Sequence, residues 1–288
     1  MSAPMSESAS ESALPEPGVP HVLSGDQIAG YLKDGCLFPI DVFTPEEAMD
    51  WAAQFEALPL DQLLALPAPW TQKTYILLDW LDALMRDPRL TAIAADLLGE
   101  DLLVISADLF WKPARSAKRI SWHQDLNYWG LEPNDVVTAW VALTMAVPEN
   151  GGMQYAPGKH QALAAHAEHK TDDNMLTKGQ ELAVAIAPEE AVDVALMPGQ
   201  VAFHHGLTPH ASGPNLTDAP RIGFAIRYAP TRVRQTKGPA MTARLARGTD
   251  LYGHFQLEPD PPAALSLQAL ALHRAVLDPH AEFGYSTI

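Results

Sequence analysis

The 288-residue chain has one cysteine, Cys36, and no long apolar run. A single thiol cannot close an internal disulfide, which excludes a disulfide-stabilised framework. No stretch approaches the roughly 18 uninterrupted apolar residues that a membrane-spanning helix needs. The opening residues 1–20 also lack the basic and apolar regions of a secretory signal. We therefore expect a cytoplasmic protein.

Basic residues are scarce as well. The chain has 19 Lys and Arg against 35 Asp and Glu, which gives a formal net charge of −16. Such a charge repels phosphate backbones and anionic lipids, so we expect neither a nucleic-acid nor a membrane partner. A small-molecule substrate is the partner that we expect. Composition leaves the oligomeric state open.

The chain divides into a tail and one domain. Residues 1–20 are rich in Ser, Glu, Pro and Ala and poor in large apolar residues, which predicts a disordered tail. Residues 21–288 are long enough for one domain with a sizeable core. Within it we expect a helical part over 24–99, a β-rich core over about 102–230 and a C-terminal extension over 231–288.

Three helix starts are readable in the helical part. Ser24 precedes apolar residues at helical spacing, and Thr44 precedes a proline and then Glu47 at the third helical position. Asp87 opens a third helix, which we expect to end before Gly99.

From Leu102 onward the pattern changes to strands separated by Gly, Pro and Asn turns. We expect strands over Leu102–Trp111, Val136–Val147, Met153–Ala156, Val192–Leu196, Val201–His205 and Arg221–Tyr228. Few helical patterns lie between them, so the predicted fold is mainly β: a double-sheet jelly roll buttressed by the N-terminal helices. The polar interval Lys159–Glu181 is too long for an ordinary hairpin and has the size of a lid, with substrate contacts expected from Asn174, Met175 and Leu176.

A candidate metal site begins at His123-Gln124-Asp125. On an extended segment His123 and Asp125 project from one face, and a second imidazole from His210 completes three ligands. Two-His-one-carboxylate sites hold Fe(II) and keep positions open for a bidentate co-substrate and O2. Arg221, eleven residues after His210, offers a forked donor for a carboxylate.

Longer runs around these residues carry a family resemblance. They are His123-Gln124-Asp125-Leu126-Asn127-Tyr128-Trp129, Glu149-Asn150-Gly151-Gly152-Met153 with Pro157-Gly158-Lys159-His160, and His210-Ala211-Ser212-Gly213-Pro214-Asn215 ending in Arg221. In order and spacing the chain resembles the phytanoyl-CoA dioxygenase family from about Leu23 to Tyr228. That resemblance implies a double-stranded β-helix, the cupin-like jelly roll.

The resemblance also implies an activity and a set of site residues. His123, Asp125 and His210 would be the catalytic iron ligands, and Arg221 would bind the C5 carboxylate of 2-oxoglutarate. Ser212 and Lys73 occupy positions of further co-substrate contacts. The implied cofactors are Fe(II), 2-oxoglutarate and O2, and the implied reaction hydroxylates an unactivated C–H bond with release of succinate and CO2. Family halogenases replace the carboxylate ligand with a small residue, so Asp125 argues for hydroxylation.

The residues that follow the first ligands are candidates for substrate binding. Asn127, Tyr128 and Trp129 come directly after Asp125, so at least one should face the cavity. His204 and His205 end a predicted strand, where alternation sends only one of them inward. His205 is either that pocket residue or a satisfied core histidine. We expect His273, near the end of the chain, at the surface.

Two other functions remain open on the residues alone. A zinc- or manganese-dependent cupin-like hydrolase or isomerase would use the same three ligands but would not need Arg221 deep in the site. A non-catalytic metal-binding barrel would not need open metal positions. Phytanoyl-CoA itself is disfavoured as substrate, because no basic cluster near the site suits a CoA diphosphate. The sequence does not identify the substrate.

Overall fold

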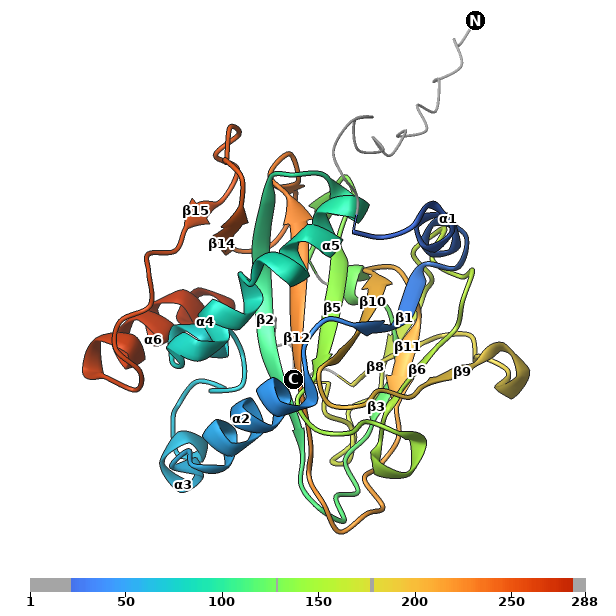
Figure 1. The fold of residues 1–288 in the computed structure, drawn as a ribbon, viewed down its shortest axis with the longest axis horizontal. Helices are drawn as coiled ribbons and strands as arrows, with labels where there is room; N and C mark the ends of the chain where they lie inside the picture. The colour runs from blue at the N-terminus through green and yellow to red at the C-terminus, as the bar shows by residue number, and fades with distance from the viewer. Residues whose placement is uncertain (1–21, 128, 177–178, 282–288) are drawn as a thin grey trace, which may run out of the picture.

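Two β-sheets pack face to face in the computed structural model, which describes residues 22–127, 129–176 and 179–281 (Figure 1). In spatial order the large sheet consists of β1 (Cys36–Asp41), β10 (Gln200–His205), β5 (Val137–Ala142), β12 (Arg221–Pro230), β2 (Leu102–Lys112), β14 (Thr242–Arg247) and β15 (Gln256–Leu257). The small sheet consists of β3 (Ile120–His123), β11 (His210–Ser212), β6 (Met153–Tyr155) and β9 (Val192–Val194). Two ribbons pair β4 (Leu131–Glu132) with β13 (Arg234–Gln235) and β7 (His166–Glu168) with β8 (Gln180–Leu182). The predicted jelly roll is confirmed.

The helices are α1 (Gly25–Asp34), α2 (Pro45–Glu56), α3 (Leu60–Leu64), α4 (Asp79–Met85), α5 (Pro88–Leu98) and α6 (Leu267–Ala281). Short 3-10 turns occupy η1 (Thr74–Ile76), η2 (Asp125–Asn127), η3 (Pro148–Asn150) and η4 (Pro188–Glu190). The three predicted helix starts are confirmed. Ser24 and Thr44 each close a capping box, and the Asp87 side chain accepts a hydrogen bond from the backbone N–H of Arg89.

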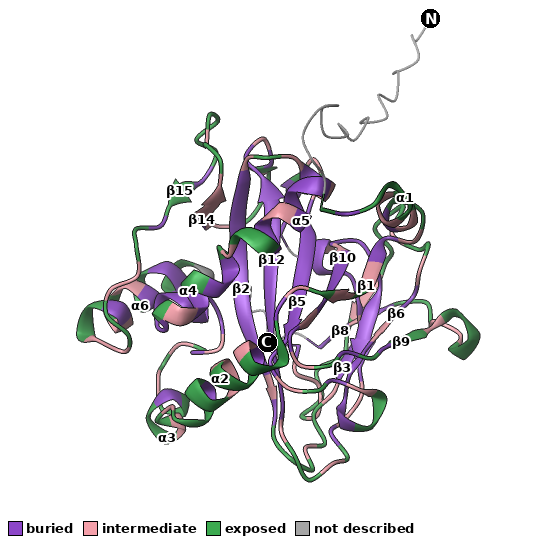
Figure 2. Ribbon diagram, in the orientation of Figure 1, coloured by how far each residue is buried: buried purple, intermediate pink, exposed green. Residues whose placement is uncertain are grey.

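The large sheet is buried on both faces, as Figure 2 shows for β2, β5 and β12. Alternation along β12 divides its side chains between two environments. Ile222, Phe224, Ile226 and Tyr228 pack in the core shared with the helices, whereas Arg221, Ala225 and Arg227 line a cavity between the sheets. Burial of both faces explains why these strands appear in the sequence as nearly continuous apolar runs.

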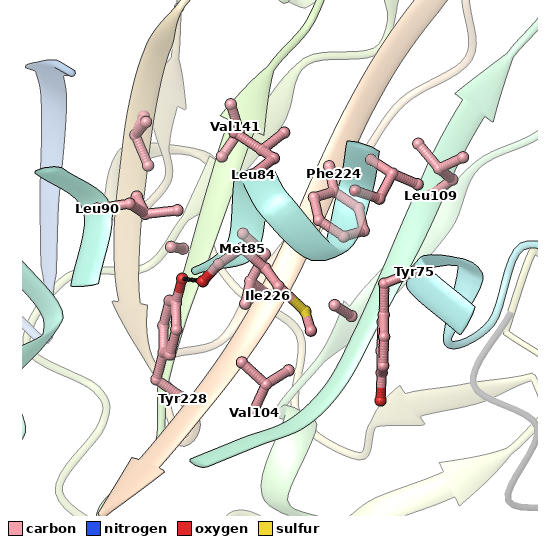
Figure 3. Close-up of a cluster of buried hydrophobic side chains, with 14 of the residues drawn as sticks. Tyr75, Leu84, Met85, Leu90, Val104, Leu109, Val141, Phe224, Ile226 and Tyr228 are labelled. Atoms are coloured by element: carbon pink, nitrogen blue, oxygen red, sulfur yellow. Dashed lines mark hydrogen bonds between the residues drawn. The ribbon is translucent and has the colours of Figure 1, made fainter. Parts of the chain in front are cut away.

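The core on the helix side fixes the large sheet. Figure 3 shows Leu84 and Met85 of α4 lying against Phe224, Ile226 and Tyr228 of β12. The Tyr228 hydroxyl donates a hydrogen bond to the carbonyl oxygen of Met85 at 2.6 Å. The strand β12, which carries the arginines of the cavity, is therefore held by an apolar core on its opposite face.

Three details differ from the sequence expectations. Cys36–Asp41, inside the segment expected to be helical, forms an edge strand, a place where its Pro39 is tolerated. The large sheet also continues beyond residue 230, because β14 pairs with β2. His273, expected at the surface, is buried, and its Nε2 lies 2.8 Å from the carbonyl oxygen of Gln72.

Two further expectations concern the ends of the chain and the lid. The predicted tail, residues 1–20, lies outside the described residues. In the described part of the interval 159–181, β7 pairs with β8. Two residues of the interval bond to β3 or to the residue before it. Asn174 Nδ2 donates to Ser121 Oγ at 2.9 Å, and Met175 N donates to the carbonyl oxygen of Arg119 at 2.8 Å. No helix in the described part of the chain has both the length and the apolar character to cross a membrane.

Candidate functional site

A cavity that is partly open to solvent lies between the two sheets. Its walls are largely apolar, with Phe110, Trp140 and Ala225 from the large sheet and Ile120 and Met153 from the small sheet. Its polar lining residues are Asp125, which follows β3, and His123, Thr138, His204, His210, Ser212, Arg221 and Arg227 from strands. Such a concave apolar site with a few convergent polar groups is typical of a small-molecule site.

His123, Asp125 and His210 meet in this cavity and form a group that could hold a metal ion. The Nε2 atoms of His123 and His210 lie 3.6 and 3.8 Å from Asp125 Oδ1. His123 ends β3, and its register partner His210 begins β11. The expected extended segment is wrong in one detail, because the strand stops at His123 and Asp125 begins the 3-10 turn η2.

Both histidines have their Nδ1 atoms against backbone carbonyl oxygens and their Nε2 atoms near Asp125. His123 Nδ1 lies 2.9 Å from the carbonyl oxygen of Ser121, and His210 Nδ1 lies 3.0 Å from that of Thr208. A carbonyl oxygen only accepts, so each Nδ1 carries a proton, and in a neutral ring Nε2 then keeps its lone pair. Burial and the neighbouring imidazoles of His123 and His204 hold the pKa of His210 well below its usual value. His210 therefore stays neutral and able to bind a metal.

Asp125 is held through its second oxygen. Thr138 Oγ1 donates to Asp125 Oδ2 at 3.1 Å, and Arg227 Nε and His204 Nε2 lie 3.6 and 3.8 Å from the same atom. Burial raises the pKa of Asp125, but the positive charge of Arg227 is the largest opposing influence, and the pKa lies well below its usual value. The carboxylate is therefore ionised, with Oδ1 directed toward the two histidines.

Arg221 is a buried cation without an anionic partner among the described residues. Its relative exposure is 1%, and its Nε and Nη2 atoms have no hydrogen-bond partner. The guanidinium lies 5.3 Å from the Trp140 ring centre. Gly223 permits that arrangement, since a Cβ there would lie 2.0 Å from the Trp140 ring. Burial lowers the pKa of Arg221 to about 10, so it remains charged at neutral pH.

Ser212 lies with Arg221 on the cavity wall, as expected for two groups that bind one ligand. Its hydroxyl oxygen accepts a hydrogen bond from Lys112 Nζ at 2.6 Å. Lys112 is the last residue of β2 and the register partner of Arg221 on β12.

Lys73 is not brought to this site. Its ammonium forms a buried ion pair with Glu258 at 2.5 Å and donates to the carbonyl oxygen of Thr242 at 2.9 Å. It is not among the residues that line the cavity. Lys73 has a left-handed backbone with φ of 43°, in a stretch whose periodicity is too weak to predict which way a side chain points.

The expected substrate residues are also placed elsewhere, as far as they are described. Asn127 is half-buried and Trp129 is buried, and neither lines the cavity. Trp129 instead packs in a satellite core, with Arg227 Cζ 5.8 Å from its ring centre. Tyr128 lies outside the described residues. Leu176 and Met175 do not line the cavity either, but they belong to the same hydrophobic cluster as its wall residues Ile120 and Met153.

The inward-facing histidine of β10 is His204. Its Nδ1 lies 2.9 Å from the Tyr155 hydroxyl, and its buried Nε2 has no hydrogen-bond partner. His205 faces away from the cavity, where its Nδ1 accepts a hydrogen bond from the backbone N–H of Leu207 at 3.1 Å. Of the two roles left open for His205, the satisfied histidine is the one observed.

The sequence reasoning missed His204, Thr138, Arg227 and Lys112. A signal existed for Arg227, because it lies six residues after Arg221 on one strand and even spacing places both on one face. Lys112 lies one residue beyond the predicted strand end at Trp111. Nothing in the local pattern distinguished His204 from His205, since the strand is apolar on both faces.

Comparisons with known proteins identify the family. The family model described as phytanoyl-CoA dioxygenase (PhyH) matches residues 31–223. An ectoine dioxygenase from Bordetella bronchiseptica is 26% identical over 231 residues, which cover 72% of this chain and 75% of that protein. A solved structure of the non-heme monooxygenase ThoJ is 34% identical with a TM-score of 0.74, covering 90% of this chain and 97% of that one. CytC3 with Fe(II) and alpha-ketoglutarate has a TM-score of 0.62 over 82% of this chain and 93% of its own; at 23% identity it supports the fold alone.

Proposed function

The chain belongs to the phytanoyl-CoA dioxygenase family, and we propose that it hydroxylates a small or medium-sized molecule at the cavity between its two sheets. It is a non-haem dioxygenase that depends on Fe(II) and 2-oxoglutarate. In the proposal His123, Asp125 and His210 hold the iron, and Arg221 with Ser212 binds the distal carboxylate of 2-oxoglutarate. Lys73 has no part in it.

The three ligands fit Fe(II) by their chemistry. Two neutral imidazoles and one carboxylate match the ligand set that non-haem Fe(II) oxygenases use, and they leave coordination positions open. When bound, the iron supplies oxygen activation coupled to oxidative decarboxylation of 2-oxoglutarate, which yields succinate and CO2.

The observation that carries the proposal is the buried, unpartnered guanidinium of Arg221. A buried charge without a partner is costly, so such a group is expected to meet an anion in the working protein. A carboxylate matches the guanidinium fork, and 2-oxoglutarate has one at the end opposite its metal-binding keto acid. A hydrolase or isomerase, or a passive metal-binding barrel, has no use for this cation.

The remaining cavity residues give the site its shape and its apolar character. Phe110, Ile120, Trp140 and Met153 exclude water from the space beside the ligands. Arg221 orients the co-substrate from one side, while Asp125 is held by Thr138 and Arg227 from the other. The apolar walls support a substrate that presents a C–H bond on an apolar portion.

The relatives narrow the substrate only to small molecules. The ectoine dioxygenase relative is named for a small solute, and another relative, from Stutzerimonas stutzeri, is named a probable hypophosphite dioxygenase. We place the enzyme in the cytoplasm without nucleic-acid or membrane partners. This placement rests on the net charge of −16 and on a single cysteine, Cys36, which is buried and free.

The test is succinate formation by purified protein incubated aerobically with Fe(II), ascorbate and 2-oxoglutarate. Slow succinate release without substrate is expected, and it should rise when a metabolite extract contains the substrate, with a product one oxygen heavier. Zn(II) or Mn(II) in place of Fe(II) should give none. Absence of 2-oxoglutarate binding and of succinate with every extract would favour the hydrolase or barrel alternatives.

A further inference from the structure

Lys112 is a fully buried lysine behind the wall that carries Arg221 and Ser212. Its relative exposure is 0%, and it is not among the residues that line the cavity. Lys112 Nζ donates to Ser212 Oγ at 2.6 Å and to the carbonyl oxygen of Gly213 at 2.5 Å. Its position is tightly enclosed, since a Cβ at Gly151 would lie 3.1 Å from Nζ.

The donors and acceptors of Ser212 and Lys112 set the direction of the hydrogen bond between them. A hydroxyl has one proton to donate and lone pairs that accept. Ser212 Oγ accepts from Lys112, which is its only hydrogen-bond partner in the described part of the chain. An ammonium has no lone pair with which to accept, so when Lys112 is protonated the Ser212 hydroxyl proton points away from it. Ser212 lines the cavity, so its free donor is available there beside the unpartnered N–H groups of Arg221.

The charge around this position also calls for an anion. Lys112 and Arg221 are register partners on adjacent strands, and no carboxylate in the described residues pairs with either. Burial and the charge of Arg221 lower the pKa of Lys112 to about 6. A carboxylate placed against Arg221 and Ser212 would offset the repulsion between the two basic groups.

We propose that Lys112 is a positioning residue for the distal carboxylate of 2-oxoglutarate: it holds the Ser212 hydroxyl from behind and directs its proton into the cavity beside Arg221. Lys112 does not touch the co-substrate and acts through Ser212. The inference rests on the proposed function, in which Arg221 and Ser212 bind that carboxylate.

The experiment compares two keto acids that differ only at the distal end. Calorimetric titrations measure binding of 2-oxoglutarate and of 2-oxopentanoate, its five-carbon analogue with a methyl group in place of the distal carboxylate, to Mn(II)-loaded protein. The variants are Lys112→Met, Ser212→Ala and their double variant. Lys118→Met is the matched control, because Lys118 is an exposed lysine whose Nζ bonds to the carbonyl oxygen of Asp172.

The expected result is selective and non-additive. Lys112→Met should weaken 2-oxoglutarate binding about tenfold or more, the loss typical of a hydrogen bond to a charged group, and leave 2-oxopentanoate binding unchanged. The double variant should bind 2-oxoglutarate no more weakly than Ser212→Ala, because Lys112 acts through that hydroxyl. Lys118→Met should match the wild type.

Equal losses for both keto acids, no loss, or additive losses in the double variant would overturn the inference. If Lys112→Met does not fold, Ser212→Ala still tests the inference, because an unchanged 2-oxoglutarate affinity in that variant would exclude the hydroxyl through which Lys112 acts. A wild-type protein that fails to bind 2-oxoglutarate with metal present contradicts the proposed function itself, which separates the two failures.

Discussion

Arg227 lies between two buried carboxylates, and one of them is the candidate metal ligand Asp125. Its Nε is 3.6 Å from Asp125 Oδ2, and its Nη1 donates to Asp108 Oδ2. Asp108 is itself fixed by Ser106 Oγ at 2.9 Å and by the backbone N–H of Lys73 at 3.0 Å. This chain of contacts sets the orientation of Asp125, so that Oδ1 remains free for a metal.

Removing the contacts that orient Asp125 should weaken metal binding, although all three ligands remain. Thr138→Val deletes one hydrogen bond to Asp125 Oδ2 at nearly constant volume, and Arg227→Lys keeps the charge but loses the fork. Each should lower Fe(II) affinity about 10- to 100-fold, the usual effect of losing an outer partner of a ligand. Anaerobic Fe(II) titration measures it, and wild-type affinity in both variants would show that Asp125 needs no such support.

Deleting a ligand should have a larger effect. His123→Ala or His210→Ala removes one of only three protein ligands, so Fe(II) binding and 2-oxoglutarate turnover should both fall to background. The fold should persist, because both histidines line the cavity, on the opposite side of β12 from the apolar core that it shares with the helices. Circular dichroism provides that control, and turnover retained by a folded variant would contradict the assignment.

Substitutions of Arg221 test 2-oxoglutarate binding separately from metal binding. Loss of a bidentate, desolvated carboxylate contact costs about 2–5 kcal/mol, or roughly 30- to several-thousand-fold in affinity. Arg221→Ala should therefore raise the 2-oxoglutarate requirement at least about tenfold while Fe(II) affinity stays near wild type, and Arg221→Lys should fall between. Succinate formation is measured against 2-oxoglutarate concentration. An unchanged dependence in Arg221→Ala would remove the main reason for preferring an oxygenase.

Lys112 predicts a pH dependence of co-substrate binding. Its pKa of about 6 without an anion leaves it mostly neutral at pH 7 to 8. A bound carboxylate favours the charged form and raises that pKa, so binding takes up a proton and affinity falls as pH rises above about 6. The neighbouring basic group, Arg221, has a pKa of about 10 and does not titrate in this range.

The measurement is the 2-oxoglutarate dissociation constant of Mn(II)-saturated protein from pH 6 to 8. It should rise by up to about tenfold per pH unit, the limit for one proton. Lys112→Met should show a flatter curve, and 2-oxopentanoate should show a flat one with either protein. Identical slopes for both keto acids would assign the effect to another group.

The sequence alone predicted the elements that depend on contacts between residues close together in the chain. Ser24, Thr44 and Asp87 cap helices through contacts within three residues, and the apolar runs of the large sheet become strands because both faces are buried. Because both faces of the large sheet are buried, its apolar pattern does not show which face lines the cavity. His204 and His205 are therefore equivalent in the sequence, although only His204 lines the cavity.

Long-range packing decides the rest. The resemblance implied that Lys73 contacts the co-substrate, but its partner Glu258 lies 185 residues away, in a C-terminal part for which no role was predicted. Lys112, one residue past the predicted end of its strand, reaches Ser212 only when β2 and β11 are brought together by the fold. No spacing rule within the chain predicts either contact.

Lys73 provides the last prediction, which separates a structural lysine from a co-substrate ligand. Its ion pair with Glu258 is buried on both sides, with side-chain exposures of 7% and 2%, and Glu258 also accepts from the Tyr75 hydroxyl at 2.6 Å. Lys73→Met leaves a buried carboxylate without its cation and should destabilise the fold by about 3–5 kcal/mol. Lys73→Met combined with Glu258→Leu removes both charges and should recover much of that loss, because a buried pair contributes little over apolar replacements of similar size.

Chemical denaturation measures the stability, and calorimetry at a temperature where every variant is folded measures 2-oxoglutarate binding. Binding should be unchanged throughout, whereas a selective loss of 2-oxoglutarate affinity in Lys73→Met would return Lys73 to the co-substrate site.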